Sequence, residues 1–156
     1  MIRAWRVVKR KYVDSAFDGE GARRAGGRWN SPGKPVIYTA ESSALAILEM
    51  VVHVETSLLS HYVVIPVRFS EKQTTRVDLA DLPRDWRTHP GPADLRRIGD
   101  RWLESRSSLA LMVPTAIAPA GWNYLLNPAH PDFSRLDIGD PVDFKMDSRL
   151  LDLHPE

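Results

Sequence analysis

Several short stretches of this chain alternate apolar and polar residues, or concentrate β-branched and aromatic side chains, and both patterns are typical of β-strands. In the first stretch, Trp5 and Val7 alternate with Arg6. We predict strands over residues 4–8, 36–39, 61–69, 109–117 and 142–146. Pro66 interrupts the third strand and indicates an edge position or a bulge there, because proline cannot donate a ladder hydrogen bond.

Two other stretches carry apolar residues at helical spacing. Residues 42–52 follow Glu41 and begin with two serines, either of which can cap the exposed N–H groups of a first turn. Residues 93–104 place Leu95, Ile98 and Trp102 on one side of a helix. We therefore predict two main helices.

The remaining segments are rich in glycine, proline and asparagine, which predict loops. They are residues 14–27, 76–92 and 122–133, and Leu82 and Trp86 are expected to anchor the second of them to the core. No linker, repeat or low-complexity tract divides the 156 residues. We predict a single α+β domain over residues 1–156, with a mixed β-sheet core and helices packed against it.

Composition narrows the class of protein. The chain has no cysteine, which excludes disulfides and thiolate metal sites. No apolar run follows the charges of the first residues, so neither a signal peptide nor a membrane anchor is expected. A cytoplasmic protein without membrane association is the expectation.

Charge is unevenly distributed along the chain. Residues 1–34 hold nine basic and three acidic residues, a net charge of +6, whereas the whole chain carries +1. A basic N-terminal quarter suggests an anionic partner, such as a phosphate-bearing ligand, a nucleic acid or an acidic protein surface. A solvated basic face without any partner is the alternative.

Glu49 is the one charged residue of the predicted helix 42–52. Apolar residues surround it on nearly every side, as in a buried helix. An unpaired buried carboxylate is strongly unfavourable, so Glu49 is expected to face a cleft, a partner or a buried cation. A structural salt bridge to an arginine is the alternative. His53 completes a Glu-x-x-x-His spacing that is too weak a signal for a metal, and we predict no metal site.

Other polar residues precede that helix. A glycine-rich turn carries Arg28, and the strand after it carries Tyr38. Together with Glu49 they lie on three consecutive elements, which indicates a site for a small ligand. The alternatives are a hairpin with an exposed arginine and a tyrosine that only packs. The chain lacks both a Walker A sequence and a Gly-x-Gly-x-x-Gly between strand and helix, so these phosphate loops are not supported.

Five blocks of the chain, taken in order, resemble the RES domain family. They read Gly-Gly-Arg-Trp-Asn-Ser-Pro-Gly (residues 26–33), Val-Ile-Tyr-Thr (36–39), Ala-Ile-Leu-Glu (46–49), Ser-Ser-Leu-Ala-Leu-Met-Val-Pro (107–114) and Asn-Tyr-Leu-Leu-Asn-Pro-Ala-His-Pro (123–131). The resemblance covers nearly the whole chain and leaves no further domain. It implies a fold similar to that of the ADP-ribosyltransferases.

The resemblance also implies a function. RES domains are the toxins of RES–Xre toxin–antitoxin pairs, which degrade NAD at the nicotinamide–ribose bond, arrest growth and are held inactive by a cognate Xre-type helix-turn-helix antitoxin. NAD would then be a substrate, and no cofactor is expected. A homodimer within the toxin–antitoxin complex is a further expectation. The acceptor stays open between water, phosphate and a protein side chain.

Carried onto this chain, the family's arginine falls on Arg28, its tyrosine on Tyr38 and its glutamate on Glu49. The resemblance then implies that Arg28 holds the pyrophosphate and that Glu49 stabilises the positive charge that develops on the ribose. Tyr38 would offer a ring against which nicotinamide packs, and Asn30 is a further candidate for ligand binding.

The family's serine is assigned to Ser107, which would orient the substrate through its hydroxyl. Ser108 and Thr115 are the alternatives, and Thr115 would keep only the hydroxyl. Two other functions are considered beside NAD degradation. One is ADP-ribosylation of a protein target. The other is nucleic-acid binding through the basic N-terminal quarter, which we do not expect because it gives Glu49 no role.

Overall fold

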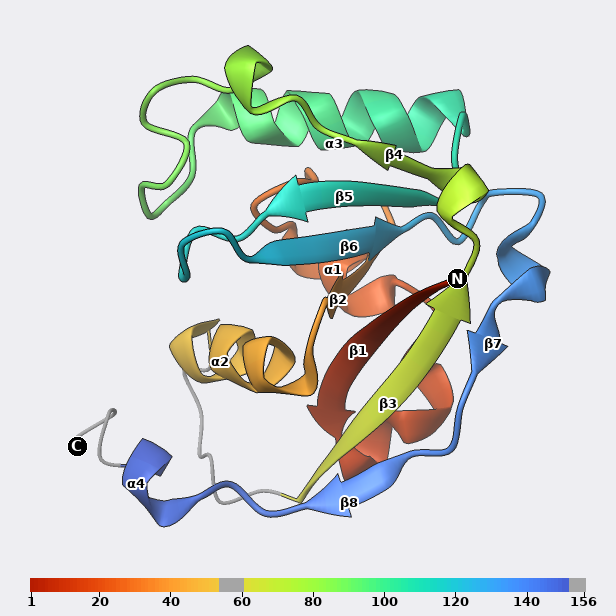
Figure 1. Cartoon of the computed structure of the whole chain (residues 1–156), viewed down its shortest axis with the longest axis vertical. Coiled ribbons are helices and arrows are strands. Elements are labelled where there is room, and N and C mark those ends of the chain that lie inside the picture. Colours follow the sequence, from red (N-terminus) through yellow and green to blue (C-terminus); the bar gives the residue numbers. More distant parts are fainter. Residues whose placement is uncertain (54–60, 152–156) are drawn as a thin grey trace.

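The computed structural model describes residues 1–53 and 61–151 of the chain. Its centre is an eight-stranded sheet in the order β4-β5-β6-β2-β1-β3-β7, with β8 also pairing with β3 (Figure 1). The strands β4 and β5 pair in parallel, and the other described pairings are antiparallel. The strands are β1 (Ile2–Lys9), β2 (Ile37–Ala40), β3 (Tyr62–Phe69), β4 (Thr74–Arg76), β5 (Ala110–Pro114), β6 (Trp122–Leu126), β7 (Asp137–Ile138) and β8 (Val142–Phe144).

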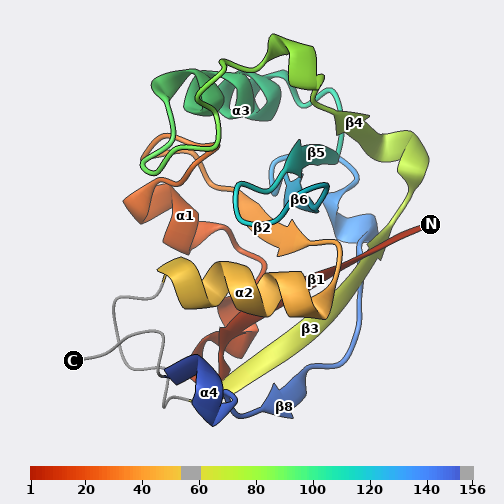
Figure 2. The same ribbon diagram turned by 60° about the vertical axis from the view of Figure 1, so that its left-hand side comes forward.

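Four α-helices accompany the sheet in the described part of the chain: α1 (Glu20–Ala25), α2 (Ser43–His53), α3 (Ala93–Ser105) and α4 (Ser148–Leu151). Figure 1 shows α3 lying along the end of the sheet that β4, β5 and β6 form. Helix α2 packs against β1 and β2, and Figure 2 shows α1 next to it. The predicted single α+β domain with a mixed sheet is therefore the observed architecture.

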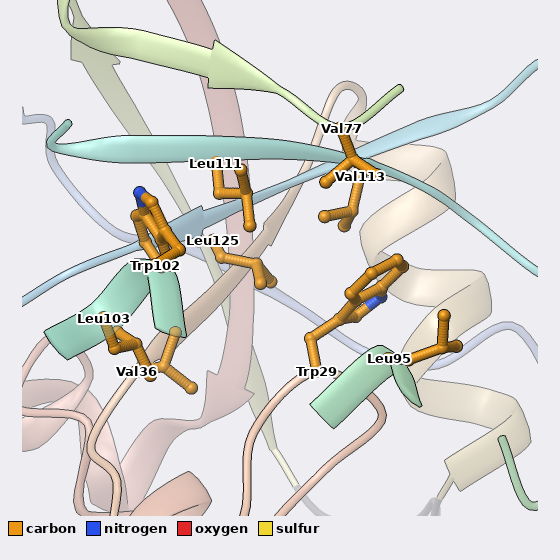
Figure 3. Packing of buried hydrophobic residues seen from close by; sticks show 9 residues of the cluster. All are labelled: Trp29, Val36, Val77, Leu95, Trp102, Leu103, Leu111, Val113 and Leu125. Atoms are coloured by element: carbon orange, nitrogen blue, oxygen red, sulfur yellow. The ribbon is translucent and has the colours of Figure 1, made fainter. Parts of the chain in front are cut away.

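The largest apolar cluster lies between α3 and the sheet. Because side chains alternate along a strand, Leu111, Val113 and Leu125 face α3, whereas their neighbours on β5 and β6 pack on the opposite face. Figure 3 shows how the cluster encloses two indole rings; its buried members are Trp29, Val36, Val77, Leu95, Trp102, Leu103, Leu111, Val113 and Leu125. The cluster fixes the position of Trp29 and therefore of the loop that carries Arg28.

Gly99 explains how closely α3 can approach that loop. A Cβ atom at this position would lie 1.7 Å from the carbonyl oxygen of Trp29, a distance that no side chain can occupy. The helix and the loop pack backbone to backbone at this point, and only glycine permits it.

Helix α2 begins as predicted, because Ser42 Oγ accepts a hydrogen bond from the N–H of Leu45 at 3.0 Å. The prediction that the helix is buried all round is wrong. Leu45 and Val51 are buried, whereas Ala44 and Val52 are exposed. The reason is that α2 packs with one side only, against β1 and β2.

Two of the predicted loops contain regular structure. Residues 122–126 form β6, a strand between β5 and β2, because the two prolines and the second asparagine of the segment all come after Leu126. Residues 20–25 form α1, in which Glu20 and Arg23 make a bidentate contact one turn apart. The loop prediction for both segments is therefore wrong.

The other predicted elements are found with small shifts in their ends. Helix α3 and strands β1, β2, β3, β5 and β8 occupy the expected segments. Leu82 and Trp86 pack against the large cluster and anchor the segment between β4 and α3, as predicted. Pro66 lies on β3 between the residues that pair with β8 and those that pair with β7, where the outer ladder is interrupted. A proline is tolerated at such a point because its missing N–H breaks no ladder bond.

Candidate functional site

A cavity of about 820 Å³ opens between α1, α2 and the sheet. Its volume is within the range usual for small-molecule sites, roughly 300–1,000 Å³. The residues that line it with polar or charged side chains include Arg6, Arg28, Tyr38, Thr39, Glu49, His53, Arg87, His89, Thr115 and Asn123. The sequence-predicted Arg28, Tyr38 and Glu49 therefore lie in one cavity, as expected.

Glu49 faces this cavity from the inner side of α2. Its Oε1 accepts hydrogen bonds from Thr115 Oγ1 at 2.5 Å and from Asn123 Nδ2 at 2.6 Å. Its Oε2 lies 3.4 Å from His53 Nε2, and its side chain is 21% exposed. Among the residues that the structure describes, no arginine forms an ion pair with Glu49. The structural salt bridge to an arginine is therefore absent from this part of the chain.

The charge of Glu49 is maintained by its neighbours. Burial on its own would raise the pKa of the carboxyl group, but the contacts of His53, Thr115 and Asn123 outweigh it and hold the pKa below its usual range. Glu49 is consequently ionised at neutral pH. An ionised, partly enclosed carboxylate suits the stabilisation of positive charge on a bound molecule.

Arg6 projects from β1 into the same cavity and is the principal site residue that the sequence analysis missed. Its Nη1 donates to the carbonyl oxygen of Tyr38 at 3.0 Å, and its Nε donates to the carbonyl oxygen of Ala16. Burial lowers the pKa of Arg6 to about 10, with Asp18 acting in the opposite direction. The guanidinium is therefore charged at neutral pH and fixed by backbone oxygens.

Arg28 reaches the cavity from the glycine-rich turn. Its Nη1 donates to the carbonyl oxygen of Trp86 at 2.9 Å, and Gly91 leaves space for it, because a Cβ there would lie 2.8 Å from Nη1. Burial lowers the pKa of Arg28 and the charge of Glu49 partly restores it. No carboxylate in the described ranges forms an ion pair with Arg6 or Arg28.

Tyr38 and Asn30 hold the glycine-rich turn together. The Tyr38 hydroxyl donates to Asn30 Oδ1 at 2.6 Å and accepts from the N–H of Trp29 at 3.1 Å. Burial raises the pKa of Tyr38, so its hydroxyl stays protonated and its ring lines the cavity. At Gly27 a Cβ would lie 2.7 Å from the tyrosine oxygen, which explains the glycine.

Asn30 is fully buried below the turn and is not among the residues that line the cavity. Its Nδ2 donates to the carbonyl oxygens of Ala22 at 2.8 Å and Lys34 at 3.0 Å. Asn30 therefore stabilises the conformation of the turn that carries Arg28.

The three candidate hydroxyls lie in different places. Ser107 is exposed and bonded to Ser105, and Ser108 is buried between Trp102 Nε1 and the carbonyl oxygen of Ala110. Neither lines the cavity. Thr115 follows β5, lines the cavity and donates to Glu49. The structure brings Thr115 to the site and does not bring Ser107 or Ser108.

Within residues 1–53 and 61–151, no group of three or more histidine, aspartate and glutamate side chains is arranged to hold a metal ion. None of the helices there has both the length and the apolar character needed to cross a bilayer.

The cavity thus combines one fixed carboxylate with three guanidiniums, those of Arg6, Arg28 and Arg87. It suits a ligand with an anionic part that the arginines bind and a part that becomes cationic beside Glu49. The fold and the cavity together define a compact α+β domain whose cavity suits a small ligand.

Comparison with known proteins identifies the family of this chain. The family model described as "RES domain" matches residues 3–147. A protein of Yersinia enterocolitica named "Toxin Res" is 40% identical over 148 residues, covering 94% of this chain and 97% of that protein. A "Prs ADP-ribosylating toxin" of Sphingobium is 36% identical over 135 residues, covering 82% and 83%. The chain belongs to the RES domain family.

A solved structure shares the fold. It is described as the crystal structure of the M. tuberculosis MbcT–MbcA toxin–antitoxin complex, and one of its chains matches with a TM-score of 0.76 at 21% identity. The match covers 92% of this chain and 84% of that chain. This chain and that chain therefore share the same α+β fold.

Proposed function

We propose that this protein is the toxin of a toxin–antitoxin pair and that it cleaves the bond between nicotinamide and ribose in NAD. The observation that carries the proposal is the ionised Glu49 held in the same cavity as Arg6 and Arg28. NAD offers the matching chemistry, because its pyrophosphate is a dianion and its ribose becomes cationic as the glycosidic bond breaks.

In this reaction, the bond between the ribose C1′ and the nicotinamide nitrogen breaks, and nicotinamide leaves with the electron pair as a neutral molecule. The oxygen of an acceptor forms the new bond to C1′ and loses its proton if the acceptor is water. Glu49 stabilises the positive charge on the ribose. Arg6 and Arg28 bind the pyrophosphate, and the ring of Tyr38 supports the nicotinamide.

The direct test is to incubate the purified chain with NAD and measure free nicotinamide by chromatography. We expect release in proportion to enzyme, with ADP-ribose as the second product if water is the acceptor and ADP-ribose 1″-phosphate if added phosphate is. Absence of release, together with salt-sensitive retention of labelled nucleic acid, would instead support the nucleic-acid-binding function.

Thr115 is our assignment for the functional hydroxyl. Thr115→Val removes a hydrogen bond to a charged group, worth roughly 1.5–3 kcal/mol, and should lower the rate of nicotinamide release by about 10- to 100-fold. Thr115→Ser keeps the donor and should retain most of the rate. Ser107→Ala alters an exposed hydroxyl outside the cavity and should leave the rate unchanged. A large loss in Ser107→Ala with none in Thr115→Val would reverse the assignment.

ADP-ribosylation of a protein is the second candidate function, favoured by the relative named "Prs ADP-ribosylating toxin". The chemistry at C1′ is the same, and the acceptor is a protein side chain in place of water or phosphate. The two functions separate when NAD with a labelled adenine is supplied together with cell lysate. Label that becomes covalently attached to protein identifies the transferase. Label that passes from NAD into free ADP-ribose or ADP-ribose 1″-phosphate identifies the NAD-degrading enzyme.

An antitoxin partner belongs to the proposed function. Support comes from the two relatives named as toxins and from the fold shared with a chain of a toxin–antitoxin complex. We propose a helix-turn-helix protein of the Xre type as this partner, and a homodimer of the toxin within the complex.

A further inference from the structure

His53 lies one helical turn after Glu49 on α2 and forms part of the cavity wall. Its Nε2 lies 3.4 Å from Glu49 Oε2, and its side chain is 54% exposed, compared with 21% for Glu49. The contact between the two side chains is thus on the solvent side of the carboxylate.

The two oxygens of Glu49 have different surroundings. Thr115 and Asn123 both donate to Oε1, at 2.5 and 2.6 Å. For Oε2, His53 is the ion-pair partner found among the described residues. Since Oε1 is already engaged by two donors, Oε2 is the oxygen that can turn toward a bound ribose.

Other titratable and charged groups face the same space. The loop between β4 and α3 contributes His89, whose ring centroid lies 6.2 Å from that of His53, and also Arg87. Arg28 and Arg6 line the cavity from the glycine-rich turn and from β1. Glu49 is therefore the acidic member of the lining, and His53 is the titratable group in direct contact with it.

We propose that His53 is a positioning residue for Glu49, which holds Oε2 in place by donating from Nε2. The inference rests on the proposed cleavage of NAD. A neutral imidazole donates one hydrogen bond and leaves the carboxylate its full charge.

The hydrogen bond from Nε2 can be tested by a conservative substitution. In His53→Gln, the side-chain amide nitrogen replaces Nε2 as a donor to Oε2. We expect this variant to keep kcat within a few-fold of the unmodified protein.

His53→Leu removes the donor altogether. Because misplacement of a catalytic group by about 1 Å can lower a rate by about 100-fold, we expect kcat to fall by about 10- to 100-fold, with a smaller change in KM. His61→Gln is the matched control, since His61 is exposed and does not line the cavity. It should keep kcat. If His53→Leu also kept the kcat of the unmodified protein, the proposal would be overturned.

A second measurement is independent of turnover. The titration of the Glu49 carboxyl carbon is followed by NMR in the unmodified protein and in His53→Leu. Because His53 helps to lower the pKa of Glu49, the variant should show a higher pKa for this group. An unchanged Glu49 titration overturns the proposal whether or not NAD is cleaved. The Glu49 titration could change although the protein releases no nicotinamide. That result would support the contact between His53 and Glu49 and would reject only the proposed function.

Discussion

Glu49→Gln is expected to lower the rate of nicotinamide release by about 100- to 1,000-fold, the range observed when one preorganised electrostatic contact is removed from an active site. Glutamine has nearly the shape of glutamate, and its amide oxygen can still accept from Thr115 and Asn123. The substitution therefore removes the negative charge while preserving most of the local packing. The measurement is the initial rate of nicotinamide release at saturating NAD.

The control for this prediction is Glu41→Gln, at the start of the same helical region. Glu41 Oε1 accepts a hydrogen bond from the N–H of Trp122, and Glu41 is not part of the cavity lining. This variant should keep the rate. Circular dichroism should show native spectra for both variants. If Glu49→Gln were instead to unfold the protein, the carboxylate would be a structural element and its assignment to the reaction would be lost.

Gly99→Ala is expected to lower the free energy of unfolding by about 3 kcal/mol, the upper end of the usual effect of overpacking. Alanine is intrinsically the better helix former by up to about 1 kcal/mol, so helix propensity alone predicts the opposite sign. Packing decides here, because the added Cβ would lie 1.7 Å from the carbonyl oxygen of Trp29. Urea denaturation followed by tryptophan fluorescence measures the change.

Gly21→Ala is the matched control for Gly99→Ala. Gly21 is also helical, in α1, and a Cβ there would have no heavy atom within 4 Å. We expect a gain of a few tenths to about 1 kcal/mol, because only propensity acts. A similar gain at Gly99 would show that α3 and the loop of Trp29 separate readily. The displacement expected at Gly99 also moves Arg28, so KM for NAD should rise in that variant.

Much of the fold follows from local patterns in the sequence. Alternating stretches and stretches of β-branched and aromatic residues predict β1, β2, β3 and β5. Apolar residues at helical spacing predict α2 and α3. The failure at β6 has a physical cause. The prolines and asparagines of segment 122–133 predict turns, but Trp122–Leu126 precede the prolines and pair with β2 and β5. Their strand state is stabilised by partners distant in sequence.

The site was predictable in part for a related reason. Glu49 stood out as a single charge in an apolar helix. Arg6 is likewise a single charged residue among apolar neighbours, Trp5, Val7 and Val8. This pattern also indicates a functional side chain and identifies the second arginine of the cavity. Asn123 carries a weaker signal, as a polar residue at the start of a strand.

The contact of Thr115 with Glu49 joins residues 66 positions apart. No spacing in the sequence indicates it, since it depends on how β5 and β6 lie beside α2. For the same reason, sequence patterns alone could not choose between Ser107, Ser108 and Thr115.

The hydrogen bonds that hold Arg6 and Arg28 in place bear on product release in the proposed reaction. Arg6 and Arg28 are held by the oxygens of Tyr38 and Trp86 and would meet the pyrophosphate, a group that the proposed reaction leaves intact. Their binding energy is then shared by the substrate and by every product that retains ADP-ribose, so it improves affinity without lowering the barrier of the chemical step. In the proposed reaction, tight binding of NAD and slow release of the ADP-ribosyl product would therefore have the same origin, the two arginines. The rate of the chemical step would then depend on how much more strongly Glu49 stabilises the transition state than bound NAD.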